Sequence, residues 1–283
     1  MTTKTQSVSH ANYTDRVLEV LTKDMNWECG TYVRNGKEYL KKHILPLKNN
    51  DNTLRNRADA IKKYFEFDCK PYLPGLRGLH QYAHHVNSSQ ILCMMFFSKL
   101  IDVKHCATKE MVKFMKDAFN IEIHEGAKCD FEYKEDIKFD VLGKSENEGT
   151  SFDFHIKDDK VEVYFEIKFT EDGFAKEKKD ADERHKCKAR QYEKLLPEYL
   201  KDNATAEDIL LNYQIFRNII RADNDKKYVI FITDGNNPAT NEDIKAFLEK
   251  FGTYIDSNHI QFKTWQEIKD KYPFKLPMQF EAL

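Results

Sequence analysis

The sequence of 283 residues lacks paired cysteine motifs. It has six cysteines, and no two of them stand in a Cys-x-x-Cys pair, which argues against a zinc ribbon and against a disulfide framework. We therefore expect free thiols in a reducing cytoplasm. These cysteines are Cys29, Cys69, Cys93, Cys106, Cys129 and Cys187.

Long apolar runs are also absent. The longest, Ile91 to Phe97, is far shorter than the roughly 20 residues that span a bilayer. The first residues do not carry the apolar core of a secretory signal. With 41% hydrophobic and 33% charged residues, the composition is too apolar for a disordered chain. We expect a cytoplasmic globular protein that does not enter the membrane.

The sequence has no large excess of either charge, since 45 Lys and Arg stand against 47 Asp and Glu. This balance argues against a surface coated with positive charge but permits a local basic patch. Residues 1–85 carry 14 Lys and Arg against 9 Asp and Glu, so the N-terminal part is basic. Its positive side chains either follow a nucleic-acid backbone or form a plain solvated surface. The candidates are Lys41, Lys42, Arg55, Arg57, Lys62 and Lys63.

Apolar spacing predicts helices over 12–26, 37–45 and 54–67, with Pro46 ending the second. The connector from Pro71 to Gly78 is rich in proline and glycine and predicts a break in regular structure. We therefore predict a basic, helical N-terminal extension over 1–80, followed by one α/β domain over 81–283.

In the second part, Asn87-Ser88-Ser89-Gln90 can cap a buried helix over 91–97, and Thr108 opens another helix that ends near Phe119. Alternation from Cys129 through Phe139 and Val141 predicts a strand, and two more strands follow over 150–156 and 161–169. Helices are expected within 171–203 and over 206–220, and a buried strand over 228–233. The resulting order is helix, three strands, helix, strand.

Acidic-x-Lys triplets are frequent in so charged a chain, and Glu132-Tyr133-Lys134 is one of them. Glu166-Ile167-Lys168 differs from the others because it lies in a strongly apolar strand, where charges are costly unless they have partners. The strand period of two puts Glu166 and Lys168 on one face. If the preceding strand forms a hairpin with this one, Asp153 can approach Glu166 across the ladder.

Two carboxylates that meet on a sheet repel each other unless a cation lies between them, and oxygen ligands suit Mg²⁺. Lys168 beside them can face a phosphate or orient the attacking water. Phosphodiester hydrolysis needs a metal that activates water and positive charge where negative charge gathers. These residues therefore favour a nuclease.

At these positions the sequence resembles the PD-(D/E)XK nuclease superfamily, over about residues 81–235. The motifs also look like those of one subgroup of bacterial restriction-endonuclease-like proteins: Asn87 to Gln90, Glu166-Ile167-Lys168-Phe169-Thr170-Glu171, and Gln214-Ile215-Phe216-Arg217-Asn218. Phe152 stands where the superfamily usually has a proline. The resemblance implies an α-β-β-β-α-β core, with a central mixed sheet flanked by helices.

The resemblance also implies a Mg²⁺- or Mn²⁺-dependent endonuclease that acts on DNA. Asp153, Glu166 and Lys168 would be catalytic, and the backbone carbonyl of Ile167 an extra metal ligand beside the two acids. Gln90, Gln214 and Arg217 would stand at the rim of the site.

Other interpretations remain open at this stage. The acids and the lysine could form a cross-strand salt bridge. Gln90 could be a buried structural amide, and Gln214 and Arg217 could belong to a helix surface. His84 and His85 are adjacent and poorly placed to bind one metal together. The protein could also be a nuclease-fold binding module without turnover, or an RNA-directed nuclease, and a homodimer is compatible with the sequence.

Overall fold

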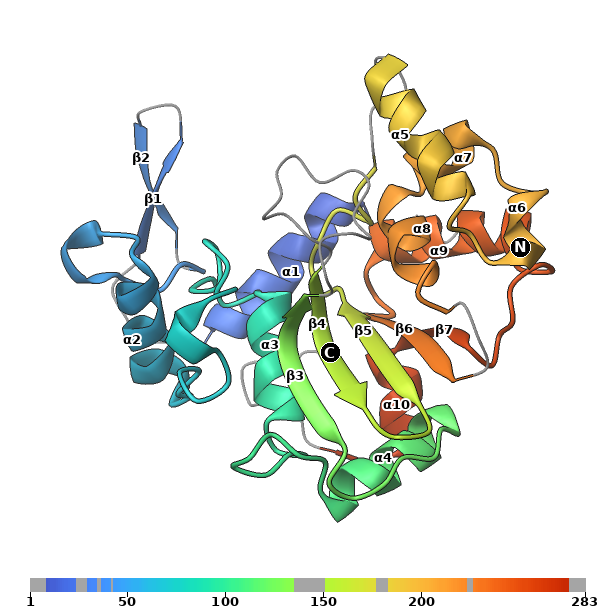
Figure 1. The fold of residues 1–283 in the computed structure, drawn as a ribbon. Helices are drawn as coiled ribbons and strands as arrows, with labels where there is room; N and C mark the ends of the chain where they lie inside the picture. Colours follow the sequence, from blue (N-terminus) through green and yellow to red (C-terminus); the bar gives the residue numbers. More distant parts are fainter. Residues whose placement is uncertain are drawn as a thin grey trace, which may run out of the picture.

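A computed structural model describes residues 9–23, 30–34, 37–41, 43–134, 151–176, 183–222 and 226–274. Its centre is a five-stranded mixed sheet in the order β3-β4-β5-β6-β7 (Figure 1). β3 and β4 and then β4 and β5 pair antiparallel, whereas β5 and β6 and then β6 and β7 pair parallel. The strands are β3 Lys128–Lys134, β4 Ser151–Lys157, β5 Glu162–Ile167, β6 Lys227–Thr233 and β7 Ile260–Thr264.

Helices cover both faces of this sheet. One hydrophobic cluster joins the sheet to α3 Ser89–Phe97, α4 Lys109–Phe119 and α10 Trp265–Lys271. The other cluster joins it to α5 Glu183–Glu193, α6 Glu198–Lys201, α7 Ala206–Leu211, α8 Tyr213–Ile219 and α9 Pro238–Phe251. The neighbours Tyr164 and Phe165 of β5 belong to different clusters, because successive side chains of a strand point to opposite faces. The α/β class, with helices flanking a mixed sheet, agrees with the expectation.

The predicted helix starts around the core are confirmed. Ser88 caps α3 by accepting the N–H of Ile91, and Thr108 caps α4 by accepting that of Met111. Residues 90–97 are all buried, as expected for an apolar run without a polar face. The predicted helix over 206–220 is divided at Asn212 into α7 and α8.

The predicted helix over 37–45 is wrong. The segment contains strand β2 Lys37–Lys41, which pairs antiparallel with β1 Gly30–Arg34. The register places Arg34 opposite Lys37, which leaves a two-residue connection, and the sequence there reads Asn-Gly, the dipeptide typical of tight hairpins. Paired backbone hydrogen bonds thus override the apolar spacing from which we predicted a helix.

The remaining N-terminal helices are α1 His10–Thr22 and α2 Leu54–Phe65, with short 3-10 turns at Lys48–Asn50 and Pro74–Leu76. Tyr13, Val17 and Leu21 of α1 pack in the same cluster as α3 and the sheet. The hydroxyl of Tyr13 donates to Asp234 Oδ2 at 2.6 Å, just after β6. The core is therefore continuous across residue 80, the boundary that we predicted.

The second half of the chain extends beyond the expected elements, because α9, β7 and α10 add a fifth strand and two helices. The predicted strand positions Phe139 and Val141 lie outside the described residues. The cysteines whose side chains are described are free: Cys69, Cys93, Cys106 and Cys129. Within the described ranges, no helix combines the length and apolar character needed to cross a membrane.

Candidate active site

The register of β4 and β5 brings the two predicted acids together. Phe154 lies opposite Phe165, so Asp153 and Glu166 follow as the next facing positions. Oδ2 of Asp153 accepts a hydrogen bond from the backbone N–H of Ile167 at 2.6 Å. The approach of Asp153 to the third strand, expected from the hairpin, is present in the structure.

Glu166 is buried, with 6% of its surface exposed, and each of its oxygens has a partner. Lys168 Nζ lies 3.0 Å from Oε1, which also accepts from Gln214 Nε2 at 2.6 Å. Oε2 accepts from Asn218 Nδ2 at 3.0 Å. Gln214 and Asn218 stand one turn apart on α8, so this helix fixes the orientation of the carboxylate.

Gln214 contacts Glu166, and its Oε1 is held by the N–H of Ala175 at 2.9 Å. Asn218, the last residue of the downstream motif, to which we gave no role at the site, is the second amide on Glu166. The guanidinium of Arg217 lies over the ring of Tyr213, 5.8 Å from its centroid. The rim roles of Gln214 and Arg217 stay predictions.

Glu132 is a third acid of the site, and we missed it in the sequence. Its Oε1 accepts from Gln90 Nε2 at 2.5 Å, and its Oε2 accepts from the hydroxyl of Ser151 at 3.0 Å. Its backbone is left-handed, with φ of 49°, where the pairing of β3 with β4 is interrupted opposite Asp153. The side chain lies close enough to Asp153 for its charge to raise the pKa of that acid.

Gln90 thus contacts Glu132 and has the structural role that we left open, while its role at the rim stays a prediction. Its Oε1 accepts the N–H of His80 at 2.9 Å, and its Nε2 donates to the carbonyl of Gly78 at 2.8 Å. Gly78 has a φ of 88°, and a Cβ there would come 2.9 Å from Cβ of Glu132. The residue must be glycine for the loop to pass this close.

The charge of Glu166 disfavours the charged forms of Asp153 and Glu132. Burial raises the pKa of Asp153 well above its usual range, and the charges of Glu166 and Glu132 raise it further. Burial also raises the pKa of Glu132 to about 7, although its hydrogen bonds from Gln90 and Ser151 oppose this. Burial alone would lower the pKa of Lys168, but the surrounding carboxylates raise it, so the ammonium stays charged.

These side chains open into a cavity of about 550 Å³. Part of its lining is charged, consisting of Glu132, Asp153, Lys168 and Glu171. The rest comes from Thr170 and from residues between 80 and 90, including Gln90. An open cavity with convergent polar groups and perturbed carboxylates is the arrangement expected of an active site.

The donor set suits a hard divalent cation. Among the described residues, no three His, Cys, Asp or Glu side chains are placed to hold a metal ion. However, Mg²⁺ commonly binds through one or two carboxylates and keeps several waters, so Asp153 and Glu166 are the residues that would hold it. A cation beside them would offset the repulsion that raises the pKa of Asp153. The carbonyl of Ile167 remains a predicted further ligand.

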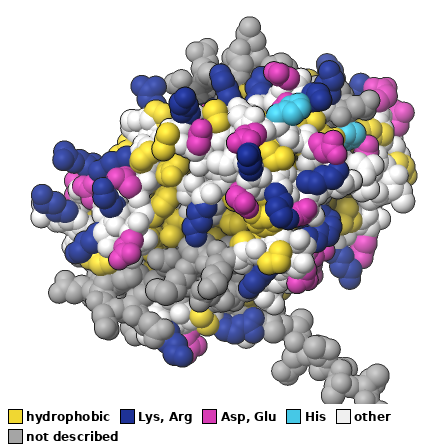
Figure 2. All heavy atoms as spheres, turned by 90° about the horizontal axis from the view of Figure 1, so that it is seen from below, with side chains coloured by type: hydrophobic (Ala, Val, Ile, Leu, Met, Phe, Trp, Pro, Cys, Tyr) yellow, Lys and Arg dark blue, Asp and Glu magenta, His cyan; other side chains and the backbone are white. Residues whose placement is uncertain are grey.

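The predicted basic residues separate into exposed and buried ones. Arg57 is buried at 7% exposure and donates to the side chain of Asn52 at 2.8 Å and to the carbonyl of Leu79 at 3.3 Å, so it holds the fold together and does not present its charge to solvent. The exposed residues are Lys41, Arg55, Lys62 and Lys63, and Lys42 lies outside the described residues. On the face in Figure 2, Lys and Arg are scattered among Asp and Glu.

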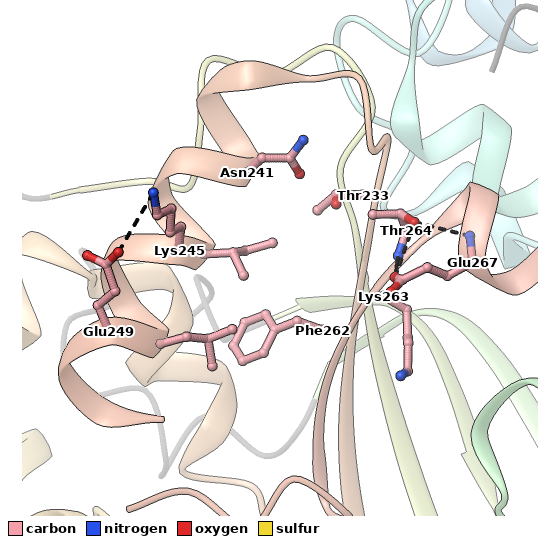
Figure 3. A pocket seen from close by; sticks show the side chains of 10 residues that line it. Thr233, Asn241, Lys245, Glu249, Phe262, Lys263, Thr264 and Glu267 are labelled. Atoms are coloured by element: carbon pink, nitrogen blue, oxygen red, sulfur yellow. Dashed lines mark hydrogen bonds and ion pairs between the residues drawn. The ribbon is translucent and has the colours of Figure 1, made fainter. Parts of the chain in front are cut away.

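Another cavity, of about 490 Å³, lies between α9 and β7 (Figure 3). Its floor includes Phe262 and Leu248. Three of the charged residues on its lining are engaged, because Lys245 pairs with Glu249 at 3.8 Å and Glu267 caps α10 through Thr264. None of the acids of the candidate site lines it. We therefore place the chemistry at the cavity that contains Asp153 and Lys168.

A sequence model of the family described as Restriction Endonuclease associating with ARP matches residues 20–280, nearly the whole chain. No curated protein and no solved structure gives a significant match.

Proposed function

Because the chain belongs to the family described as Restriction Endonuclease associating with ARP, we propose that it is a metal-dependent endonuclease of the PD-(D/E)XK type acting on DNA. Asp153, Glu166 and Lys168 are its catalytic residues in this proposal. Mg²⁺ is the proposed cofactor, and Mn²⁺ is the alternative.

The observation that carries the proposal is the convergence of Asp153, Glu166 and Lys168 beside one open cavity. Lys168 follows directly after β5, and its N–H still bonds the carbonyl of Ile232 at 2.8 Å, so its backbone is fixed by the sheet. Its side chain pairs with Glu166 at 3.0 Å and lines the cavity with Asp153. A structural salt bridge alone would need neither the cavity nor the second acid.

The roles of the residues follow from their charges. Asp153 and Glu166 would hold the cation, which lowers the pKa of water and offsets charge on the phosphate when bound. The ammonium of Lys168 would stabilise the negative charge that gathers on the phosphate oxygens during attack. Gln214 and Asn218 would keep the carboxylate of Glu166 aimed at the cation while Lys168 turns to the phosphate.

The test is a cleavage assay on plasmid, linear and single-stranded DNA and on RNA, with Mg²⁺, with Mn²⁺ and with a chelator. We expect metal-dependent cleavage of DNA that is lost in the Glu166→Gln variant. Cleavage of RNA alone would make the enzyme RNA-directed. Binding of nucleic acid without cleavage under any metal would contradict the proposal and favour a binding module.

A further inference from the structure

The lining of the catalytic cavity contains three ring-bearing residues, His80, Tyr82 and His85, which we call the ring wall. Residues 87–90 follow it with hydroxyl and amide side chains. Among the described lining residues, Lys168 is the one cation, against three carboxylates. The cavity can therefore match one phosphate at the catalytic residues, while the ring wall suits an uncharged part of the substrate.

The rings form a continuous series along the cavity lining. The centroids of His80 and Tyr82 are 5.3 Å apart at an interplanar angle of 58°, and those of Tyr82 and His85 are 5.2 Å apart at 52°. Tyr82 is 49% exposed, unusually high for a large aromatic ring at a cavity. Because these rings are tilted and do not stack on one another, a flat ligand ring can still find an aromatic face.

The two histidines of the ring wall are suited to a neutral ligand. Burial and the neighbouring histidines lower the pKa of His85 to about 3, and burial and Arg57 lower the pKa of His80. Both imidazoles are therefore uncharged near neutral pH and do not attract the phosphate backbone. Within the described part of the chain, Nε2 of His85 is buried without a hydrogen-bond partner.

The ring wall is fixed in place before any ligand arrives. The N–H of His80 is held by Gln90, and Nδ1 of His80 accepts the N–H of Tyr82 at 3.3 Å. His85 forms an isolated antiparallel bridge with Ile44. Asn87 joins this segment to the catalytic side by donating to Thr170 Oγ1 at 2.6 Å. A preorganised wall loses little conformational entropy on binding.

We propose that the ring wall is a stacking subsite for one unpaired nucleobase beside the phosphate at Lys168, so that the preferred substrate is DNA with an unpaired nucleotide at the cleavage position. The inference rests on the proposed nuclease function. Aromatic side chains bind unpaired bases by stacking, whereas a base in a duplex has its faces covered by its neighbours. The volume of about 550 Å³ falls within the range of about 300–1,000 Å³ for sites that hold single small ligands.

The test compares three fluorescent DNA pools of random sequence: single strands, full duplexes, and duplexes with one bulged 2-aminopurine. Binding is measured in Ca²⁺ by anisotropy, and stacking by the quenching of 2-aminopurine fluorescence. We expect the native protein to bind the unpaired forms more tightly than duplex. Tyr82→Ala should lose about 5- to 150-fold in affinity for the unpaired forms, the effect of removing one base–aromatic contact, with duplex affinity unchanged.

Several variants keep the result interpretable. Tyr82→Phe retains the ring and should restore tight binding, and His80→Ala should act in the same direction as Tyr82→Ala. Tyr254→Ala removes a comparably exposed tyrosine, 42% against 49% for Tyr82 and away from the lining, and should have no effect. Melting curves check that each variant folds.

The inference is overturned if Tyr82→Ala binds every DNA as the native protein does, or loses affinity for duplex and unpaired forms equally. Tighter binding of unpaired RNA than of unpaired DNA would also overturn it. Metal-dependent cleavage without an effect of Tyr82→Ala would support the proposed nuclease function and contradict the base subsite. A Tyr82 effect without any cleavage would contradict the nuclease function and leave the base subsite intact.

Discussion

Oδ2 of Asp153 accepts the backbone N–H of Ile167 at 2.6 Å, so the acid of β4 is hydrogen-bonded directly to β5, which carries Glu166 and leads into Lys168. The hydrogen bond to the backbone of β5 thus fixes the position of the Asp153 side chain, and this does not require the negative charge. Asparagine at this position can accept the same hydrogen bond through its amide oxygen. The geometry of the site can therefore be kept while the negative charge is removed.

The Asp153→Asn variant should lose metal-dependent cleavage and gain stability. The charged form of Asp153 is disfavoured by burial and by Glu166 and Glu132, which is why its pKa is raised. Removing this charge should raise Tm by about 2–4 °C, which corresponds to about 1 kcal/mol in a protein of this size. Thermal melting without metal and cleavage with Mg²⁺ measure the two effects. Full activity of the variant would show that Asp153 is not a catalytic residue.

Glu166→Gln should lower stability, in contrast to Asp153→Asn. Glu166 is the partner of the buried ammonium of Lys168 at 3.0 Å, and its loss leaves that cation without its ion pair. We expect a lower Tm together with lost cleavage, measured on the same preparations. A rise in Tm for both variants would show that repulsion between the acids outweighs the ion pair.

Lys168→Met tests the catalytic role of the ammonium. The substitution keeps most of the buried stem and removes the charge. If the charge serves the transition state, single-turnover cleavage should fall by about 10²- to 10³-fold, while DNA affinity in Ca²⁺ stays nearly the same. Unchanged turnover with a lowered Tm would support a structural salt bridge and leave the protein without its proposed catalytic lysine.

Glu132→Gln should change the pH dependence of stability. The pKa of Glu132 is about 7 in the folded protein and about 4.3 in an unfolded chain, so folding is favoured by the protonated form. This stabilisation is fully present below about pH 4.3 and is lost as pH rises toward 7. The free energy of unfolding of the native protein should therefore fall by up to about 3 kcal/mol over this range. The Glu132→Gln variant, which has no charge at this position, should not show this fall.

The measurement is the difference in unfolding free energy between Glu132→Gln and the native protein from pH 4 to pH 8, without divalent metal. The glutamine can keep the hydrogen bonds with Gln90 and Ser151, so the comparison isolates the charge. Glu125→Gln, on an exposed turn, is the control and should show no such change. A difference that is constant with pH would contradict a raised pKa at Glu132.

The exposed basic residues Arg55, Lys62 and Lys63 can be tested together by substitution with glutamine. If they contact phosphates, the dependence of log affinity on log salt concentration should weaken by about 2–3 for duplex DNA. The matched control replaces Lys109, Lys113 and Lys116 of α4. Arg57 is left in place, because its buried hydrogen bonds make it structural. An unchanged salt slope would assign the three residues to a plain surface.

The sequence alone was informative where each local signal agreed with the packing. The apolar run before Phe97 and the caps at Ser88 and Thr108 led to correct helices, because burial and capping both act within a few residues. The prediction of a helix over 37–45 was wrong because the apolar spacing of this segment fits a helix, whereas pairing with β1 determines its backbone conformation. Strand pairing depends on a partner that a periodicity does not identify.

In the candidate site, Asp153, Glu166 and Lys168 were predictable because each charge interrupts an apolar strand. Glu132 was visible as one of several acidic-x-Lys triplets, but its role depends on a left-handed backbone position and on Gln90, 42 residues earlier. The role of Asn218 likewise depends on how α8 packs on the sheet. Such contacts arise from tertiary packing and have no local sequence signal.

The hydrogen bond between Tyr13 and Asp234 also has a consequence for folding during synthesis. The two residues are 221 positions apart, and Tyr13 Oη also lies 3.2 Å from the carbonyl of Phe169, next to Lys168. During translation α1 emerges first, yet its hydrogen bond to Asp234 cannot form until the residue after β6 has left the ribosome. A chain that ends before β6 therefore lacks both the fourth strand of the sheet and one anchor of its first helix. The sheet and the contacts of its first helix are thus completed only late in synthesis.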